Sequence, residues 1–140
     1  MNTQPYSHTN KGNASVLIVD DVPVNVTLIE KMLTPFHFSI RKAYDGQTAL
    51  DMVAEQKPSL IILDLMMPGI SGYDVIRQLR NNDETKKLPI IIVSALNSHE
   101  DIVKGFNLGA NDFITKPIIV NRLYDSIKTQ LDKTYGIENK

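Results

Sequence analysis

Polar residues that could do chemistry follow the apolar runs of strand length in this chain. They are Asp20 and Asp21 after residues 16–19, Asp64 after 59–63, Ser94 after 90–93 and Lys116 after 112–115. Because ligands of parallel sheets bind beyond the carboxyl ends of the strands, residues in these places can converge on one site. Asp64 is expected at the centre of that site.

Three carboxylates in one crevice repel one another, so they would either raise a pKa or hold a hard cation. Magnesium is favoured, because it takes one or two carboxylates together with a phosphate and keeps several waters. The positive charge of Lys116 and the hydroxyl of Ser94 both suit a phosphoryl group. Asp64 would then be the nucleophile that takes this group as an aspartyl phosphate.

Each of these residues also has a structural explanation when it is taken alone. Asp21 could cap the helix that follows it, Ser94 could be a turn residue, and Lys116 could be a solvated surface lysine. Gly69 and Gly72, which follow Asp64, are explained by ordinary turn chemistry. The shared location of the polar residues is what favours the functional interpretation.

Two other classes of protein could place an acidic residue at a strand end. A mononucleotide binder of the same fold should carry a loop rich in Ser, Thr and Gly after the first strand, whereas Asp20 and Asp21 stand there. A phosphatase with an aspartyl nucleophile usually has a second Asp two positions later as general acid, and Met66 occupies that position. A small phosphohydrolase, or a binding module that is not phosphorylated, stays as the alternative.

Apolar residues recur at helical spacing in the segments between the strand-like runs. Strands are predicted at 16–19, 38–43, 59–63, 90–93 and 112–115, and helices at 22–33, 47–56, 72–79, 102–108 and 119–131. The first, third and fourth strands are almost wholly apolar and should be central, because central parallel strands are buried on both faces. The pattern predicts an α/β fold with a doubly wound five-stranded parallel sheet, in the order 2-1-3-4-5, and five helices. Ile102, Val103, Phe106 and Leu108 outline the fourth helix.

The length indicates one domain, and the composition gives no general electrostatic reason to bind nucleic acid or an anionic membrane. The chain has 140 residues, with 15 Lys and Arg against 16 Asp and Glu, and no Cys. The balance of charge predicts no direct binding to nucleic acid. The sequence contains no apolar run of the roughly 18 residues that are needed to cross a membrane. The expected compartment is the cytoplasm. The expected organisation is a disordered leader at 1–14, one domain at 15–133, and a C-terminal tail or linker start at 134–140.

Several motifs in separate parts of the chain resemble those of a known family. They are Asp20-Asp21, Asp64 with Met67-Pro68 and Gly72, Ser94-Ala95, and Lys116-Pro117. Together they resemble the receiver domain of two-component response regulators, over about residues 15–131. The resemblance implies that Asp64 accepts phosphate from a histidine kinase or a histidine phosphotransfer protein. It also implies that the chain is not an enzyme and catalyses only its own phosphorylation and dephosphorylation.

The resemblance further implies a role for each neighbour of Asp64. Asp20, Asp21, Asp64 and the backbone carbonyl of Met66 would hold Mg2+, Ser94 would bind a phosphoryl oxygen, and Lys116 would pair with the phosphate. Ser94, Phe113 and Pro117 would form the switch, with Phe113 where many members have tyrosine. A structural alternative is that Phe113 packs on the last helix.

The resemblance also bears on lifetime and output. Met66 and Leu96 occupy positions that tune dephosphorylation in the family, and both are apolar. Finer motifs are similar to receivers attached to hybrid histidine kinases or diguanylate cyclases, so the chain is expected to be either a stand-alone regulator or a piece of a longer protein with an output domain. A homodimer through the fourth helix, fifth strand and fifth helix is one outcome that this similarity suggests.

Overall fold

The computed structural model describes residues 14–136 and contains five strands that alternate with five α-helices. The strands are β1 (Ser15–Val19), β2 (Ser39–Ala43), β3 (Leu60–Leu63), β4 (Ile90–Ser94) and β5 (Asp112–Thr115). The helices are α1 (Pro23–Leu33), α2 (Gly46–Glu55), α3 (Gly72–Arg80), α4 (His99–Leu108) and α5 (Val120–Thr134), and a short 3-10 helix, η2 (Thr34–Phe36), follows α1. The predictions for residues 1–13 and 137–140 lie outside the described residues.

All strands pair in parallel, in the order β2-β1-β3-β4-β5, which confirms the predicted topology. The apolar strands β1, β3 and β4 occupy the centre because both of their faces are covered, while the mixed strands β2 and β5 form the edges. The central strands run side by side, with Val19 opposite Leu63 on the neighbouring strand. The ends of β1 and β3 are therefore adjacent, at the point where the strand order reverses.

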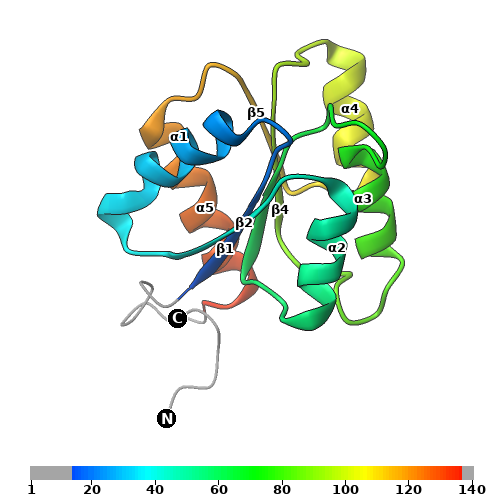
Figure 1. Cartoon of the computed structure of the whole chain (residues 1–140), viewed down its shortest axis with the longest axis horizontal. Helices are drawn as coiled ribbons and strands as arrows, with labels where there is room; N and C mark the ends of the chain where they lie inside the picture. Colours follow the sequence, from blue (N-terminus) through cyan, green and yellow to red (C-terminus); the bar gives the residue numbers. More distant parts are fainter. Residues whose placement is uncertain (1–13, 137–140) are drawn as a thin grey trace.

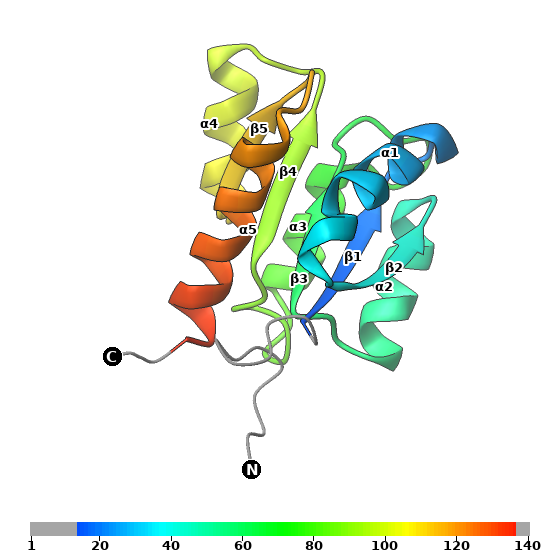
Figure 2. The ribbon, with the colours of Figure 1, turned by 90° about the vertical axis from the view of Figure 1, so that its left-hand side faces the viewer.

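The helices cover the sheet in two layers (Figures 1 and 2), with α1 and α5 on one face and α2, α3 and α4 on the other. Successive residues of β1 point to opposite faces. Val16 and Ile18 join the cluster beneath α1 and α5, whereas Leu17 and Val19 join the cluster beneath the other three helices. Strand β1 is thus held from both sides by a packed apolar layer.

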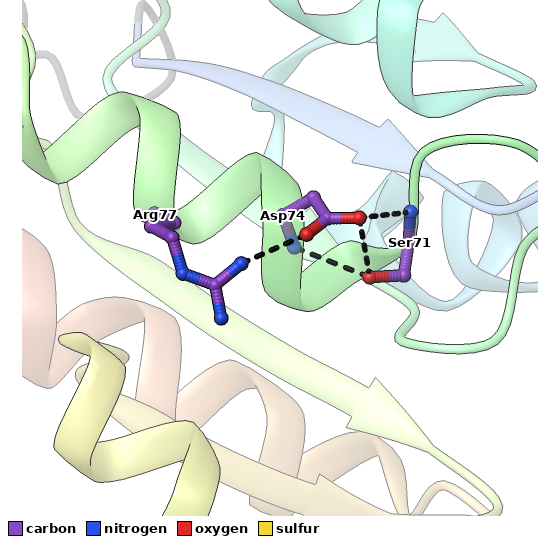
Figure 3. A network of polar contacts seen from close by, with 3 residues as sticks. All are labelled: Ser71, Asp74 and Arg77. Carbon is purple, nitrogen blue, oxygen red and sulfur yellow. Dashed lines mark hydrogen bonds and ion pairs between the residues drawn. The ribbon is translucent and has the colours of Figure 1, made fainter.

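Local sequence signals explain where the helices begin and end. Pro23 stands in the first turn of α1, where its missing N–H costs little. Helix α3 begins with a capping box in which Ser71 and Asp74 exchange hydrogen bonds, and Arg77 pairs with Asp74 at 2.8 Å (Figure 3). Helix α4 ends at Gly109, whose φ of 116° favours glycine.

Helix α4 buries little of its apolar surface against the sheet. Its one fully buried residue is Gly105, while Val103 and Phe106 are 39% and 45% exposed. A Cβ at Gly105 would lie 2.8 Å from Cδ1 of Ile92, so the glycine lets the helix backbone approach β4 closely. The predicted fourth helix is present, and the residue that it buries fully is this glycine rather than Val103 or Phe106.

Candidate functional site

Backbone hydrogen bonds beyond the strands fix the residues that carry the candidate chemistry. The N–H of Asp64 donates to the carbonyl of Val19 at 3.0 Å, and the N–H of Asp20 donates to that of Ala43 at 3.2 Å. On the other side, the N–H of Lys116 donates to the carbonyl of Ser94 at 2.9 Å. The ladder therefore extends one residue past β1, β3 and β5, so Asp20, Asp64 and Lys116 start from a hydrogen-bonded backbone.

Three carboxylates converge at the ends of β1 and β3. One side-chain oxygen each from Asp20, Asp21 and Asp64 lies within 4.8 Å of the others. Asp20 and Asp64 are only 2% and 8% exposed, and Asp21 is half-buried. Asp21 does not cap α1, since this helix begins after Val22 without a side-chain cap. The capping explanation for Asp21 is therefore wrong.

The surroundings of Asp64 disfavour its charged form. Burial, and next the negative charge of Asp20, raise the pKa of Asp64 to about 6, although the positive charge of Lys116 acts in the opposite direction. Three carboxylates thus converge in this crevice, where one lysine pairs with Asp20. A site of oxygen ligands with excess negative charge fits a hard divalent cation such as Mg2+.

The raised pKa of Asp64 predicts a distinctive pH dependence of stability in magnesium-free solution. Between the pKa of about 4 for an unfolded Asp and the value of about 6 in the fold, the folded state binds more protons than the unfolded state. This group therefore makes the free energy of unfolding fall as the pH rises through that window. We expect Asp64→Asn to remove this fall.

Denaturant unfolding of both proteins at several pH values measures the effect. The free energy of unfolding of Asp64→Asn minus that of the wild type should increase from about pH 4 to about pH 6 and stay constant at higher pH. A difference that is the same at pH 4 and pH 7 would contradict the raised pKa.

Lys116 and Asn25 bind the same oxygen of Asp20. The Lys116 Nζ and the Asn25 Nδ2 each lie 3.2 Å from Oδ2 of Asp20, and the N–H of Val22 donates to Oδ1 at 2.9 Å. Lys116 is thus part of the site, joined to the acidic cluster by an ion pair, and its peptide bond to Pro117 is cis. Sequence reasoning missed Asn25, although its place one turn after the Asp pair was a usable signal.

Ser94 and Phe113 occupy buried positions on the neighbouring strands. The Ser94 side chain is fully buried, and its hydroxyl accepts a hydrogen bond from the N–H of Leu96 at 3.2 Å. Phe113 is 7% exposed and belongs to the cluster beneath α2, α3 and α4, next to Gly105. The alternative that Phe113 packs on the last helix is therefore wrong, since the buried residues of α5 belong to the cluster on the opposite face.

The loop after Asp64 combines an exposed side chain with a tight backbone contact. Met66 is 61% exposed. The N–H of Gly72 donates to the carbonyl of Leu65 at 3.0 Å, and a Cβ at Gly72 would clash with the carbonyl oxygen of Asp64 and lie 2.7 Å from Cα of Leu65. Gly72 thus brings the start of α3 against the backbone of the candidate nucleophile, which turn chemistry alone does not explain.

Within residues 14–136, no helix has both the length and the apolar character that a membrane crossing requires.

Comparisons with known proteins agree on one family. The model of the response regulator receiver domain matches residues 16–128. The response regulator PleD of Caulobacter vibrioides is 42% identical over 106 residues, which are 76% of this chain and 23% of PleD. Among solved structures, the signal receiver domain of a signal transduction histidine kinase from Syntrophus aciditrophicus superposes with a TM-score of 0.81 at 28% identity, covering 91% of this chain and 96% of that one. The receiver domain of Francisella response regulator 1452 gives 0.80 at 28% identity, covering 86% and 98%.

The extent of these matches shows what is shared. This chain spans about a quarter of PleD but nearly the whole of the solved receiver domains. The family match covers β1 to most of α5, and it includes all of the residues in the acidic cluster. The chain therefore belongs to the response regulator receiver domains of two-component signalling.

Proposed function

We propose that this receiver domain accepts a phosphoryl group on Asp64 from the phosphohistidine of a histidine kinase or a histidine phosphotransfer protein. The observation that carries the proposal is the convergence of three carboxylates within 4.8 Å at the ends of β1 and β3, with Lys116 paired to one of them. We propose the cytoplasm as the compartment of this exchange. The chain would act as a signalling module that catalyses only its own phosphorylation and dephosphorylation.

The acidic cluster supports a bound Mg2+ during this transfer. Asp20, Asp21 and Asp64 would provide carboxylate oxygens, and the backbone carbonyl of Met66 would be a further ligand. When bound, Mg2+ neutralises negative charge on the transferred oxygens. The ionised Asp64 carboxylate attacks the phosphorus, a P–O bond forms as the P–N bond breaks, and the leaving imidazole nitrogen takes a proton.

Lys116 and Ser94 would hold the phosphoryl group after transfer. Lys116 now pairs with Asp20, and its flexible side chain would move its charge to the phosphoryl oxygens. The Ser94 hydroxyl, which accepts the N–H of Leu96, has its own O–H with which it would donate to a phosphoryl oxygen. Ser94, Phe113 and Pro117 would form the switch that responds to phosphorylation. Phe113 would carry the change to α4, because it packs beside Gly105 of that helix.

The exposed apolar side chains of α4 support an output through the face that α4, β5 and α5 form. Val103 and Phe106 lie on this helix and are more than a third exposed. A second domain, a separate protein or another copy of the chain could read a change there, and PleD, of which this chain covers 23%, illustrates a longer regulator. Sedimentation with and without beryllofluoride would show whether a homodimer forms.

The experiment that tests the proposed function uses a small phosphodonor. Incubation of the protein with acetyl phosphate and Mg2+ should add one phosphoryl group, seen by intact mass, and the modification should be labile to hydroxylamine as acyl phosphates are. A chelator added beforehand should prevent it. No modification with acetyl phosphate, or with any phosphohistidine donor, would contradict the proposal.

The two apolar residues that tune dephosphorylation in the family predict that the lifetime of the phosphorylated state is set mainly by how well they shield the phosphoryl bond. Met66 is exposed and Leu96 is half-buried, and neither offers a polar group that could orient an attacking water. We expect Met66→Asn to speed loss of the phosphoryl group about tenfold, because its carboxamide can position that water. Decay of the phosphorylated protein after removal of donor measures this. Met66→Leu should decay as wild type does, and an unchanged rate in Met66→Asn would count against the role.

A further inference from the structure

Asn25 contacts the acidic cluster from α1 although none of the roles described above involves it. Its Nδ2 donates to Oδ2 of Asp20 at 3.2 Å, the same oxygen that Lys116 binds at 3.2 Å. Oδ1 of this carboxylate accepts the N–H of Val22. Asp20 is 2% exposed, so its charge is stabilised mainly by these protein donors rather than by bulk water.

The two side chains that share this oxygen differ in how firmly they are held. Asn25 lies in the first turn of α1, where its own N–H donates to the carbonyl of Val22 at 2.9 Å, and its short side chain is half-buried. Lys116 follows β5 and reaches Asp20 through a flexible four-carbon side chain. Asn25 is therefore a fixed donor, and Lys116 is a movable one.

The difference in charge between the two donors also has a consequence. A cationic side chain in place of Asn25 would stabilise Asp20 but would repel a divalent cation held by the same carboxylates. The neutral amide of Asn25 donates a hydrogen bond without adding positive charge to the cluster. It therefore supports the carboxylate and leaves the negative charge available to the cation.

We propose that Asn25 is a positioning residue that keeps the Asp20 carboxylate oriented toward Asp64 when Lys116 leaves it for the phosphoryl group. Without Asn25, the departure of Lys116 would leave Oδ2 of a buried carboxylate without a side-chain donor, which is unfavourable. Residues that hydrogen-bond to metal ligands typically change metal affinity or activity 10- to 100-fold when they are replaced. This inference rests on the proposed function, because it assigns Lys116 and Asp20 the roles given there.

Binding measurements on Asn25→Leu and Asn25→Ala test the proposal. Leucine is similar in size to asparagine but cannot donate, and alanine removes the volume as well. Asn107→Leu is the matched control, because Asn107 is an exposed asparagine on α4. With saturating Mg2+, we expect both Asn25 variants to bind beryllofluoride about tenfold more weakly than wild type, and the control to bind as wild type does. Wild-type affinity in either Asn25 variant would overturn the proposal.

A second background isolates the shared oxygen. When Lys116 is present, Asn25→Leu should weaken the binding of Mg2+ alone only a few-fold. In the Lys116→Met background, Oδ2 of Asp20 has lost the lysine, and Asn25 is the side-chain donor that is left. Adding Asn25→Leu to that background should therefore weaken Mg2+ binding about tenfold. Calorimetric titration with Mg2+ of the single and double variants measures this. Equal losses in the two backgrounds would overturn the inference, whereas failure of the wild type itself to bind Mg2+ would overturn the proposed function.

Discussion

Asp64→Asn is expected to accept no phosphoryl group from acetyl phosphate or from a phosphohistidine donor, at any concentration of Mg2+. The carboxamide is neutral and is not a nucleophile at neutral pH, so the acyl phosphate cannot form. The variant should fold, because the side chains have the same shape and the N–H of residue 64 still donates to the carbonyl of Val19. Intact mass after incubation with the donor measures the loss.

Two control variants distinguish the nucleophile from its neighbours. Asp51→Asn makes the same chemical change on an exposed carboxylate of α2, outside the acidic cluster, and should be phosphorylated as wild type is. Asp21→Asn removes one proposed oxygen ligand for Mg2+, so its phosphorylation should be slow and should recover in part as Mg2+ is raised. Phosphorylation of Asp64→Asn to the wild-type level would mean that another residue is the acceptor.

Gly72→Ala is expected to have the largest effect of any single methyl group near the site. Its Cβ would clash with the carbonyl oxygen of Asp64 and lie 2.7 Å from Cα of Leu65, and backbone atoms cannot move aside as a flexible side chain can. Overpacking of this kind destabilises by about 1–3 kcal/mol. Because the clash involves the backbone of the nucleophile, phosphorylation should also slow, by about a factor of 100 for a displacement near 1 Å.

Chemical denaturation and the rate of phosphorylation by acetyl phosphate measure the two effects of Gly72→Ala. Gly69→Asn is the matched control in the same loop. Gly69 has a φ of 75°, a Cβ added there would meet no atom within 4 Å, and asparagine tolerates this conformation better than most other non-glycine residues do. It should therefore change stability and rate little. If Gly72→Ala had the stability and the phosphorylation rate of the wild type, the close approach of α3 to the backbone of Asp64 would matter neither for stability nor for phosphorylation.

The topology and the position of the site could be predicted from the sequence because both follow from one pattern. Buried central strands require continuous apolar runs, and the residue that follows such a run lies at the carboxyl end of the strand, where ligands bind. Asp20 and Asp64 satisfy this rule, and the ladder hydrogen bonds at Val19 and Ala43 show how the backbone enforces it. Sequence periodicity reports such regular structure well.

The features that sequence reasoning missed depend on the third dimension. The contact between Asn25 and Asp20 depends on the angle at which α1 leaves the strand, and hydropathy carries no information on that angle. The burial of Gly105 in α4 was not predicted, because a glycine adds little to a hydrophobic pattern, yet it permits a close approach to the sheet. Phe113 was compatible with either face, since an aromatic on a short edge strand lacks a pattern that assigns it to one side.

The shallow anchoring of α4 has an energetic consequence. A helix whose fully buried contact is a glycine exposes little new apolar surface when it shifts, so its alternative positions lie close in free energy to the resting one. A modest difference in interaction energy at the carboxyl end of β4 is then enough to shift the populations of these positions of α4. A small displacement of α4 at Gly105 therefore costs less free energy than the same displacement of a helix that is anchored by large apolar side chains.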